Sequence, residues 1–347
     1  MTTRLARWYR ATVCVAMVAV AGLPNAARAQ TGRARVLIVT GVAGEPQYAD
    51  VFFKQATTMI DALRTRFGVP DSDIVFLAEN PARDPARIKA ASTSENIVRE
   101  LTALGAKSRT GDVLFVMLIG HGSGDGTVAR FNVPGPDITD GELARVLDGI
   151  TAPFVAIVNA ASASGGFIAR LSGPNRVIVT ATKSDMEKNQ TRFAGYFIQA
   201  YASDVADADK DGRVSVLEAF DYARREVARA YESEHHLLTE HAQLDDNGDH
   251  KGTAAPDAKS ADGALARRVF LGGTSGSVAA VARAAAANDP RVAALEREKD
   301  SIETKLDSLR RKKASMDSTA YQKALEGLLV QLAEKNKAIR DATGGRP

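Results

Sequence analysis

The sequence predicts an α/β protein with a mainly parallel sheet and helices on both faces. Unbroken apolar runs, typical of strands buried on both sides, occur at residues 113–119 and 154–158, and mainly apolar runs that also predict strands occur at 36–41, 73–77 and 176–180. Segments with apolar residues at helical spacing separate these runs, at 51–63, 97–104, 143–147 and 193–201. Strands that alternate with helices in this way form a parallel sheet with helices above and below it.

Capping residues mark the starts of two of these helices. Ser92 with Glu95, and Thr139 with Glu142, have the spacing of a capping box, in which each side chain bonds the backbone N–H of the other residue. Short helices are therefore expected to begin at both places. A later apolar run at 264–271 predicts a sixth strand at an edge of the sheet.

The first 29 of the 347 residues have the composition of a secretory signal peptide. Three arginines precede an apolar run at 11–23, which is too short to span a bilayer, and an A-x-A cleavage sequence follows at 27–29. The sequence therefore predicts an exported protein, periplasmic or secreted, with no stable membrane anchor. The single cysteine, Cys14, lies in the removed segment, so the mature chain has neither a disulfide nor a cysteine nucleophile.

Three further segments follow the signal peptide. Residues 30–271 are expected to form the α/β domain, and 272–290, rich in Gly, Ser and Ala, a linker. Residues 291–341 predict a helical hairpin with a coiled-coil-like seam, because apolar residues recur at heptad spacing among dense charges. This hairpin either packs on the rest of the chain or supports self-association. The formal net charge of +3 gives no indication of nucleic-acid binding, and none is expected.

Two chemically useful side chains follow neighbouring strands. His121 comes after the run at 113–119, and Ser162 comes after the run at 154–158. In a parallel sheet both positions lie at the carboxyl edge, where ligands bind. A histidine and a hydroxyl at this edge have the chemistry of a base and a nucleophile.

The residues around this pair resemble a known family. Gly-His-Gly-Ser at 120–123 and Ala-Ser-Ala-Ser-Gly-Gly-Phe at 161–167 resemble the two motifs of caspase-like (clan CD) cysteine peptidases, especially legumain-like bacterial members. The resemblance covers roughly 36–271, with further matches at 44–46, 134–137 and 180–182. It implies a caspase-like fold and peptide-bond hydrolysis. It places His121 as the base, Gly122 as a backbone N–H donor to the oxyanion, and Ser162 at the nucleophile.

Ser162 stands where the family has cysteine, and this departure leaves two interpretations. A thiol with a pKa of about 8.5 is readily held as a thiolate, whereas a serine hydroxyl must lose its proton to the base during attack. In serine peptidases a buried carboxylate orients the catalytic histidine. Asp125 and Asp137 are candidates for this role beside His121 only because they are near it in sequence. The favoured interpretation is a pseudopeptidase that binds a peptide or protein in its cleft. The alternative is an active peptidase with Ser162 as nucleophile and His121 as base.

Residues 207–218 match the EF-hand calcium loop at every ligand position. Gly212 permits the sharp turn at the sixth place, and an aliphatic residue stands at the eighth. The sequence predicts a structural Ca²⁺ site with ligands from Asp207, Asp209, Asp211, the backbone carbonyl of Arg213, Ser215 and Glu218.

A second acidic stretch, at 244–252, lacks the glycine and glutamate of such a loop. It is interpreted as a solvated turn, with partial calcium ligation as the alternative. The nearby His235, His236 and His241 have no spacing that predicts a tetrahedral zinc site, and they are expected at the surface.

Overall fold

The computed structural model describes residues 32–151, 153–209, 212–256, 261–272 and 316–342, together with part of 291–315. The predicted signal peptide, nearly all of the predicted linker and the proposed ligand Asp211 lie outside the described residues.

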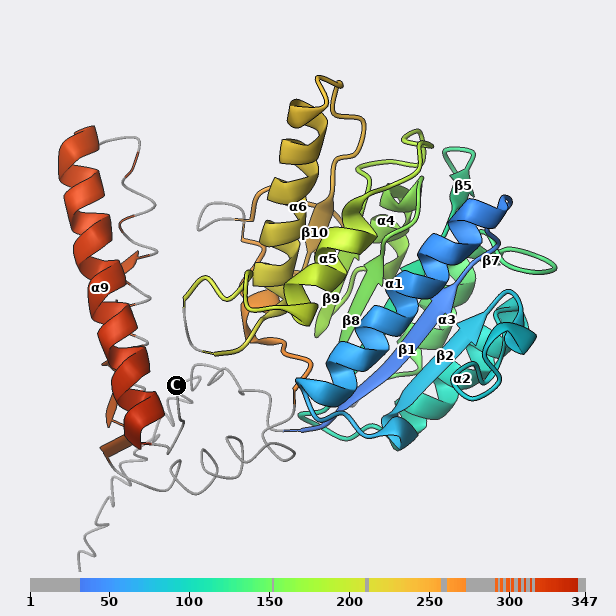
Figure 1. Cartoon of the computed structure of the whole chain (residues 1–347), viewed down its shortest axis with the longest axis horizontal. Coiled ribbons are helices and arrows are strands. Elements are labelled where there is room, and N and C mark those ends of the chain that lie inside the picture. Colours follow the sequence, from blue (N-terminus) through green and yellow to red (C-terminus); the bar gives the residue numbers. More distant parts are fainter. Residues whose placement is uncertain are drawn as a thin grey trace, which may run out of the picture.

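A seven-stranded sheet forms the centre of the α/β domain (Figure 1). In spatial order it contains β10 (Gln243–Asp245), β9 (Arg176–Thr180), β8 (Phe154–Asn159), β4 (Val113–Ile119), β1 (Ala34–Thr40), β2 (Ile74–Ala78) and β3 (Ala90–Ala91). All neighbouring strands are parallel except β10, which pairs antiparallel with β9 at one edge. The predicted fold class, α/β with a mainly parallel sheet and helices on both faces, is confirmed.

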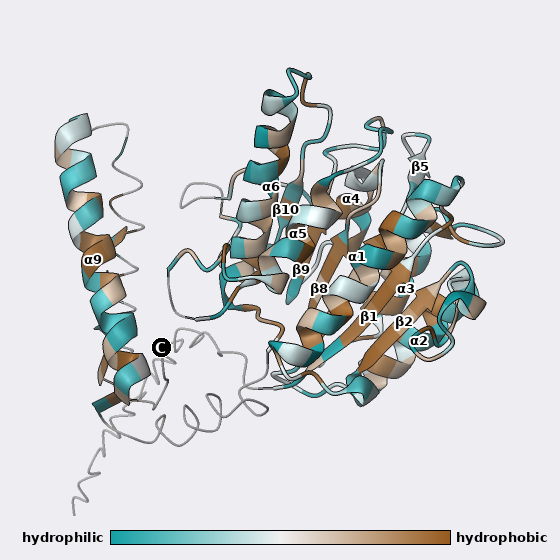
Figure 2. Cartoon of the chain, viewed as in Figure 1, coloured by the Kyte–Doolittle hydropathy of each residue, from teal (hydrophilic) through white to brown (hydrophobic). Residues whose placement is uncertain are grey.

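Helices cover both faces of this sheet (Figure 1). Alternate residues of β1 separate into two cores: Val36 and Ile38 pack with one set of helices, Leu37 and Val39 with the other. One face carries α1 (Pro46–Thr65), α5 (Phe193–Ala202) and α6 (Val216–Ser233). The opposite face carries α2 (Ser94–Lys107), α3 (Asp140–Asp148) and α4 (Ile168–Leu171). The strands are accordingly among the most hydrophobic segments in Figure 2, as two-sided burial requires.

Shorter elements complete the domain. A small antiparallel sheet leaves the carboxyl end of β4, with strands β5 (Gly122–Gly124), β6 (Ala129–Phe131) and β7 (Ile138–Thr139). Single 3₁₀ turns occur at η1 (Asp71–Asp73), η2 (Pro81–Arg83), η3 (Ser164–Phe167) and η4 (Ala266–Arg268).

One of the two predicted helix starts is correct. The capping box of Thr139 and Glu142 is confirmed at the start of α3. The box predicted for Ser92 is wrong, because the hydroxyl of Thr93 accepts the N–H of Asn96 and α2 begins one residue later than that box requires. Adjacent hydroxyl residues compete for the capping position, and the helix register decides between them.

The predicted edge strand at 264–271 is also wrong. This segment contains η4, and the carboxylate of Asp246 accepts the backbone N–H groups of Gly263, Leu265 and Ala266 at 2.7–2.8 Å. Three convergent N–H groups bound by one carboxylate stabilise a helical turn in place of a strand, and within this segment only Phe270 makes an isolated β-bridge, with Ser215. The antiparallel edge is formed by β10 instead.

The described part of the C-terminal region includes the long helix α9 (Ser318–Ala342). Its Leu332 packs against Ile302 and Leu306, and Lys335 pairs with Glu298 at 2.6 Å. The amide of Asn336 on α9 donates to the backbone carbonyl of Asp209 at 2.6 Å. Among the described residues, no helix is long and apolar enough to cross a membrane.

Candidate active site

The parallel pairing of β4 and β8 brings the two candidate motifs together. Leu118 lies opposite Asn159 in the sheet, so the chain leaves both strands at the same edge. Beyond that edge the N–H of Gly122 donates to Oγ of Ser162 at 3.2 Å, and this hydroxyl lies 3.5 Å from the Gly122 carbonyl. The structure therefore brings the hydroxyl of Ser162 and the backbone N–H of Gly122, the candidate nucleophile and the candidate oxyanion donor, into contact.

His121 is oriented by the backbone of a different loop. Its Nε2 lies 3.2 Å from the carbonyl oxygen of Ala43, in the segment after β1. A carbonyl only accepts hydrogen bonds, so Nε2 carries the proton and Nδ1 is the nitrogen that can act as a base. The rings of Tyr48 and Phe52 meet the imidazole edge-on at centroid distances of 5.2 and 5.4 Å. The ring is thus fixed on two sides by packing.

Neither carboxylate that is near in sequence contacts His121. Asp125 accepts the backbone N–H groups of Thr127 and Val128 and pairs with Arg130. These bonds hold the pKa of Asp125 below its usual range, and the largest contribution comes from the backbone N–H of Val128. Asp137 accepts the N–H of Val133 at 3.1 Å. Both acids shape the β5–β7 region, and the Ala43 carbonyl takes the orienting position instead.

The turn that carries Ser162 is tightly constrained. Ala163 has φ +52°, in the left-handed region that residues with a Cβ rarely adopt, and it is fully buried. The turn is held because the N–H of Ala163 donates to the carbonyl of Glu187 at 2.7 Å, and that of Ala161 donates to Asn159 Oδ1 at 3.2 Å. Strain of this kind is concentrated at functional sites.

Gly122 is required by the close approach of the two motifs. A Cβ at this position would lie 2.5 Å from the carbonyl oxygen of Ser162 and 2.8 Å from that of Arg130. Any larger residue would separate the candidate donor from the hydroxyl. Glycine is therefore needed at position 122 because the two backbones approach closely, and not because of its φ angle.

Ser162 itself is buried and bonded away from the histidine. Only 2% of its surface is exposed, and its hydrogen bonds within the described structure are both with Gly122. A hydroxyl needs a base in hydrogen-bond contact to become a nucleophile. The neighbouring Ser164 is structural, since its hydroxyl accepts the N–H groups of Ala181 and Thr182.

The structure adds two contributors that the sequence did not reveal. Ala43 contributes only a backbone carbonyl, which has no sequence signal. The carbonyl of Glu187 accepts the N–H of Ala163 in the turn that carries Ser162, and its carboxylate bonds Nδ1 of His241 at 2.5 Å. The side chain of His241 is 35% exposed, so this histidine lies at the surface as predicted but is bonded there to Glu187, while His235 and His236 are exposed.

Three predicted calcium ligands converge in the loop between α5 and α6. Carboxylate oxygens of Asp207, Asp209 and Glu218 all lie within 4.8 Å of one another. Burial, and then the charge of Asp209, raise the pKa of Glu218 to about 7. Oxygen ligands at this spacing suit a hard cation such as Ca²⁺. The charge of the cation would offset the free-energy cost of burying an ionised Glu218 beside Asp209. The donor set fits the predicted ion.

The remaining predicted ligands have other described contacts. The hydroxyl of Ser215 caps α6 by accepting the N–H of Glu218 at 3.2 Å, and it donates to Oε2 of Glu218 at 2.9 Å. The guanidinium of Arg213 lies over the ring of Phe270 at 3.7 Å. A cation contact with the Arg213 backbone carbonyl is compatible with that side-chain position. Asp211 lies outside the described residues.

The second acidic stretch is solvated only in part. Asn247 and Asp249 are exposed, as a solvated turn requires, but Asp245 and Asp246 are 1% and 8% exposed, and Asp262, from a later segment, is 6% exposed. Burial raises the pKa of Asp246 and of Asp262. Asp246 fixes the turn before η4, and Asp262 accepts the hydroxyl of Thr253 at 2.5 Å. These acids are therefore structural links between two chain segments.

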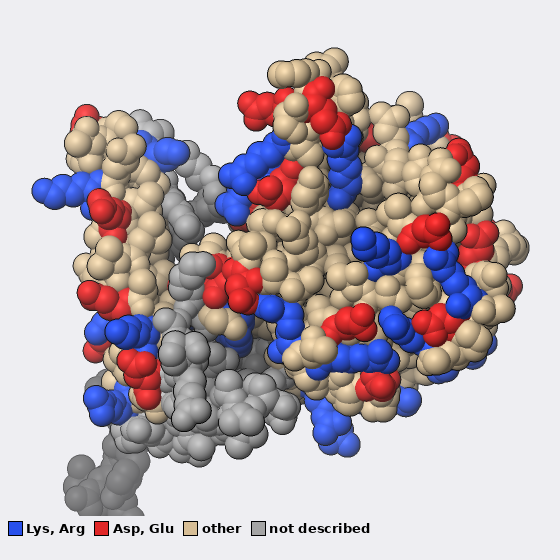
Figure 3. Space-filling model, viewed as in Figure 1, with Lys and Arg blue, Asp and Glu red and all other residues tan. Residues whose placement is uncertain are grey.

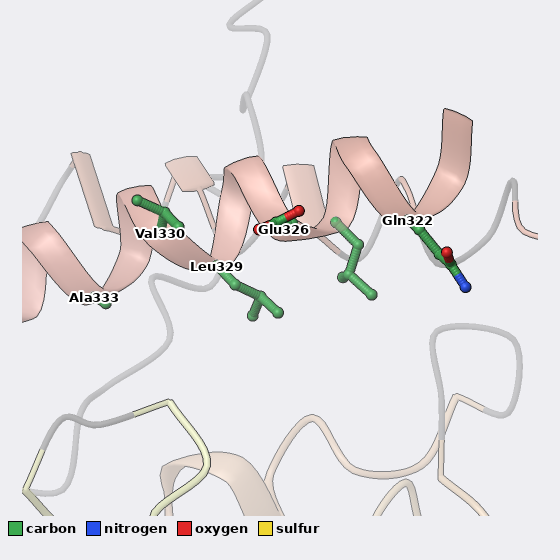
Figure 4. Close-up of a pocket in the computed structure, with 6 residues that line it drawn as sticks. Gln322, Glu326, Leu329, Val330 and Ala333 are labelled. Carbon is green, nitrogen blue, oxygen red and sulfur yellow. The ribbon is translucent and has the colours of Figure 1, made fainter. Parts of the chain in front are cut away.

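An apolar strip lies on one side of α9 (Figure 4). It contains Leu325, Leu329, Val330 and Ala333, flanked by Gln322 and Glu326, and Leu329 and Val330 are about half exposed. Self-association through these helices stays a prediction.

The arrangement defines an α/β protein with a histidine, a hydroxyl and a backbone donor at the carboxyl edge of a parallel sheet. The chain is similar in structure to protein GSU0716 from Geobacter sulfurreducens, with 11% identity and a TM-score of 0.42 over 62% of this chain and 93% of that one. It is also similar to the Drosophila initiator caspase Dronc, with 10% identity and a TM-score of 0.40 over 65% of this chain and 83% of that one. No protein-family model and no curated protein matches the sequence. At such low identities and TM-scores, neither structure assigns an activity.

Proposed function

We propose that this protein is an exported, caspase-like pseudopeptidase that binds a peptide or protein segment in its vestigial cleft. The carrying observation is the hydrogen bonding of Ser162, whose buried hydroxyl contacts Gly122 rather than His121. The N–H of Gly122 and the oriented imidazole of His121 would serve as oxyanion donor and base, but among the described residues the hydroxyl of Ser162 has no hydrogen bond to a base that could remove its proton. Such a cleft retains groups that bind a peptide carbonyl while it lacks an activated nucleophile.

Calcium is the second part of the proposal. A bound Ca²⁺ on Asp207, Asp209 and Glu218 would neutralise three acidic side chains at the start of α6 and thereby stabilise the domain. In this proposal the ion serves the stability of the domain and takes no part in the chemistry of the cleft. The face in Figure 3 carries basic and acidic side chains intermingled, which supports a peptide or protein partner over a polyanion.

The experiment compares the parent with Ser162→Ala and Ser162→Cys in Ca²⁺, using a mixed fluorogenic peptide library for cleavage and fluorescence polarisation for binding. We expect the parent and the alanine variant to bind without cleavage, and the cysteine variant to gain cleavage, because a thiol ionises near neutral pH. Binding that is absent from all three proteins would contradict the proposal.

A serine peptidase is the second candidate. The strained φ of Ala163, directly after Ser162, favours it, because stored strain of this kind often serves chemistry. In this case the parent cleaves and Ser162→Ala does not. The same experiment separates the two functions.

A further inference from the structure

A segment on the far side of the nucleophile turn contacts it at two points. The hydroxyl of Thr191 donates to the carbonyl of Ala160 at 2.6 Å, and the carbonyl of Glu187 accepts the N–H of Ala163 at 2.7 Å. The two bonds fall on either side of Ser162. Residues 187–193, named here the brace, therefore hold the turn on both sides of Ser162.

The brace is itself held by two consecutive residues before β10. The carboxylate of Glu240, which is 4% exposed, accepts the N–H groups of Arg192 and Phe193 at 2.8 and 2.7 Å. The next residue, His241, bonds the carboxylate of Glu187 through its ring and through its backbone N–H at 3.2 Å. Both ends of the brace are thus tied to one short segment.

Glu187 takes part both in the bonds between the brace and the Ser162 turn and in the bonds between the brace and residues 240–241. Its carboxylate also accepts the N–H of Lys183 at 3.0 Å, and its side chain is 11% exposed. Its backbone carbonyl faces the strained Ala163, while its side chain faces His241. A shift of this residue would therefore move the turn, because interior packing transmits small displacements.

We propose that Glu187 and His241 are positioning residues that set the conformation of the Ser162 turn. They keep the side chain of residue 162 beside the N–H of Gly122, where a bound carbonyl group would be polarised. The inference rests on the proposed function only in taking the Ser162 turn as the binding cleft. A cavity of about 120 Å³ adjoins Glu240 and His241, so substitutions there meet little steric resistance.

The test uses the full chain with Cys14→Ser and Ser162→Cys, so that residue 162 supplies the single thiol. The rate of its reaction with methyl methanethiosulfonate is measured across pH, and the midpoint reports the ionisation of the thiol. In this background we compare Glu187→Ala, Glu187→Gln, His241→Gln and Thr191→Val. Glu234→Ala is the matched control, because Glu234 also binds Arg192 but only through exposed side chains.

We expect Glu187→Ala to raise the midpoint by about one pH unit, a tenfold change in the ionisation constant, since the thiolate loses the Gly122 donor. His241→Gln and Thr191→Val should shift it in the same direction by less, and Glu187→Gln should restore most of the parent value. Glu234→Ala should leave it unchanged. Thermal unfolding confirms that each variant is folded.

An unchanged midpoint in a folded Glu187→Ala protein would overturn the inference and make the brace a purely structural element. The proposed function fails separately, when no peptide binds to the Ser162→Cys or parent protein. A midpoint that depends on Glu187 would still support the brace in that case.

Discussion

The imidazole of His121 is oriented by the backbone carbonyl of Ala43, 3.2 Å from its Nε2 and 78 residues earlier in the chain. A buried carboxylate commonly has this role beside a catalytic histidine, and it can be removed by one substitution. A backbone carbonyl cannot be removed in that way. The hydrogen bond that orients His121 is therefore independent of the side chain that residue 43 carries.

The first prediction concerns this histidine in the Ser162→Cys background. Adding His121→Ala should lower peptide cleavage by at least about 100-fold, because general acid–base catalysis is lost. Tyr48→Phe is the matched control, since it keeps the ring that contacts the imidazole. Equal rates of hydrolysis with and without His121 would show that the imidazole is not the base.

The second prediction concerns calcium. Adding Ca²⁺ should raise the melting temperature of the parent protein, and Glu218→Gln should abolish most of this increase, because the loop loses a charged ligand. The increase should be smaller at pH 5 than at pH 8, because protons compete with the cation for Glu218, whose pKa is raised to about 7. Asp249→Asn, at an exposed position outside the loop, serves as the control in the same melting experiments.

The third prediction concerns the buried Glu240. Burial raises its pKa to about 7. A raised carboxyl pKa favours the folded state below the unfolded pKa of about 4.5, and this contribution is lost as pH rises through 7. Glu240→Gln should therefore be close to the parent in stability at pH 4 and more stable at pH 8, by up to about 3 kcal/mol. Chemical denaturation at the two pH values measures the difference, and a constant difference between them would contradict the assignment.

The fourth prediction concerns the contact between α9 and the calcium loop. Asn336 is 3% exposed and donates to the carbonyl of Asp209. Asn336→Ala should cost about 1 kcal/mol of this docking and make α9 more accessible to limited proteolysis. The exposed Lys337→Ala should leave the cleavage rate unchanged. Equal proteolysis of both variants would indicate that this hydrogen bond does not hold the helix.

Local sequence patterns were sufficient for five parallel strands, β1, β2, β4, β8 and β9, and for the candidate pair. Runs such as Val113–Ile119 are apolar at every position, as a strand buried on both faces requires. His121 and Ser162 were found because each directly follows such a run, and the parallel sheet brings their positions together. The order of the strands in the sheet is enough to place His121 near Ser162, and no knowledge of side-chain packing is needed to predict this.

Contacts between distant segments were beyond the reach of sequence patterns. The bond between Glu187 and His241 joins residues 54 positions apart, and neither residue stands in a recognisable motif. The Ala43 carbonyl is a backbone atom that any residue would supply. The burial of Asp246 could not be predicted for a related reason. An acidic run is normally exposed to solvent, unless N–H groups from a distant segment converge on it, as those of Gly263, Leu265 and Ala266 do.

The last prediction tests that reading of Asp246. Its carboxylate binds the N–H groups of Gly263, Leu265 and Ala266, which would otherwise be buried without acceptors. Asp246→Ala should therefore destabilise the protein by about 2–4 kcal/mol, the cost of buried donors left unpaired. Asp249→Ala, three residues later and exposed, removes one acceptor from Lys251 and should cost less than about 0.5 kcal/mol. Denaturant unfolding of both variants measures the difference. Equal costs would mean that water replaces the carboxylate of Asp246 at this turn.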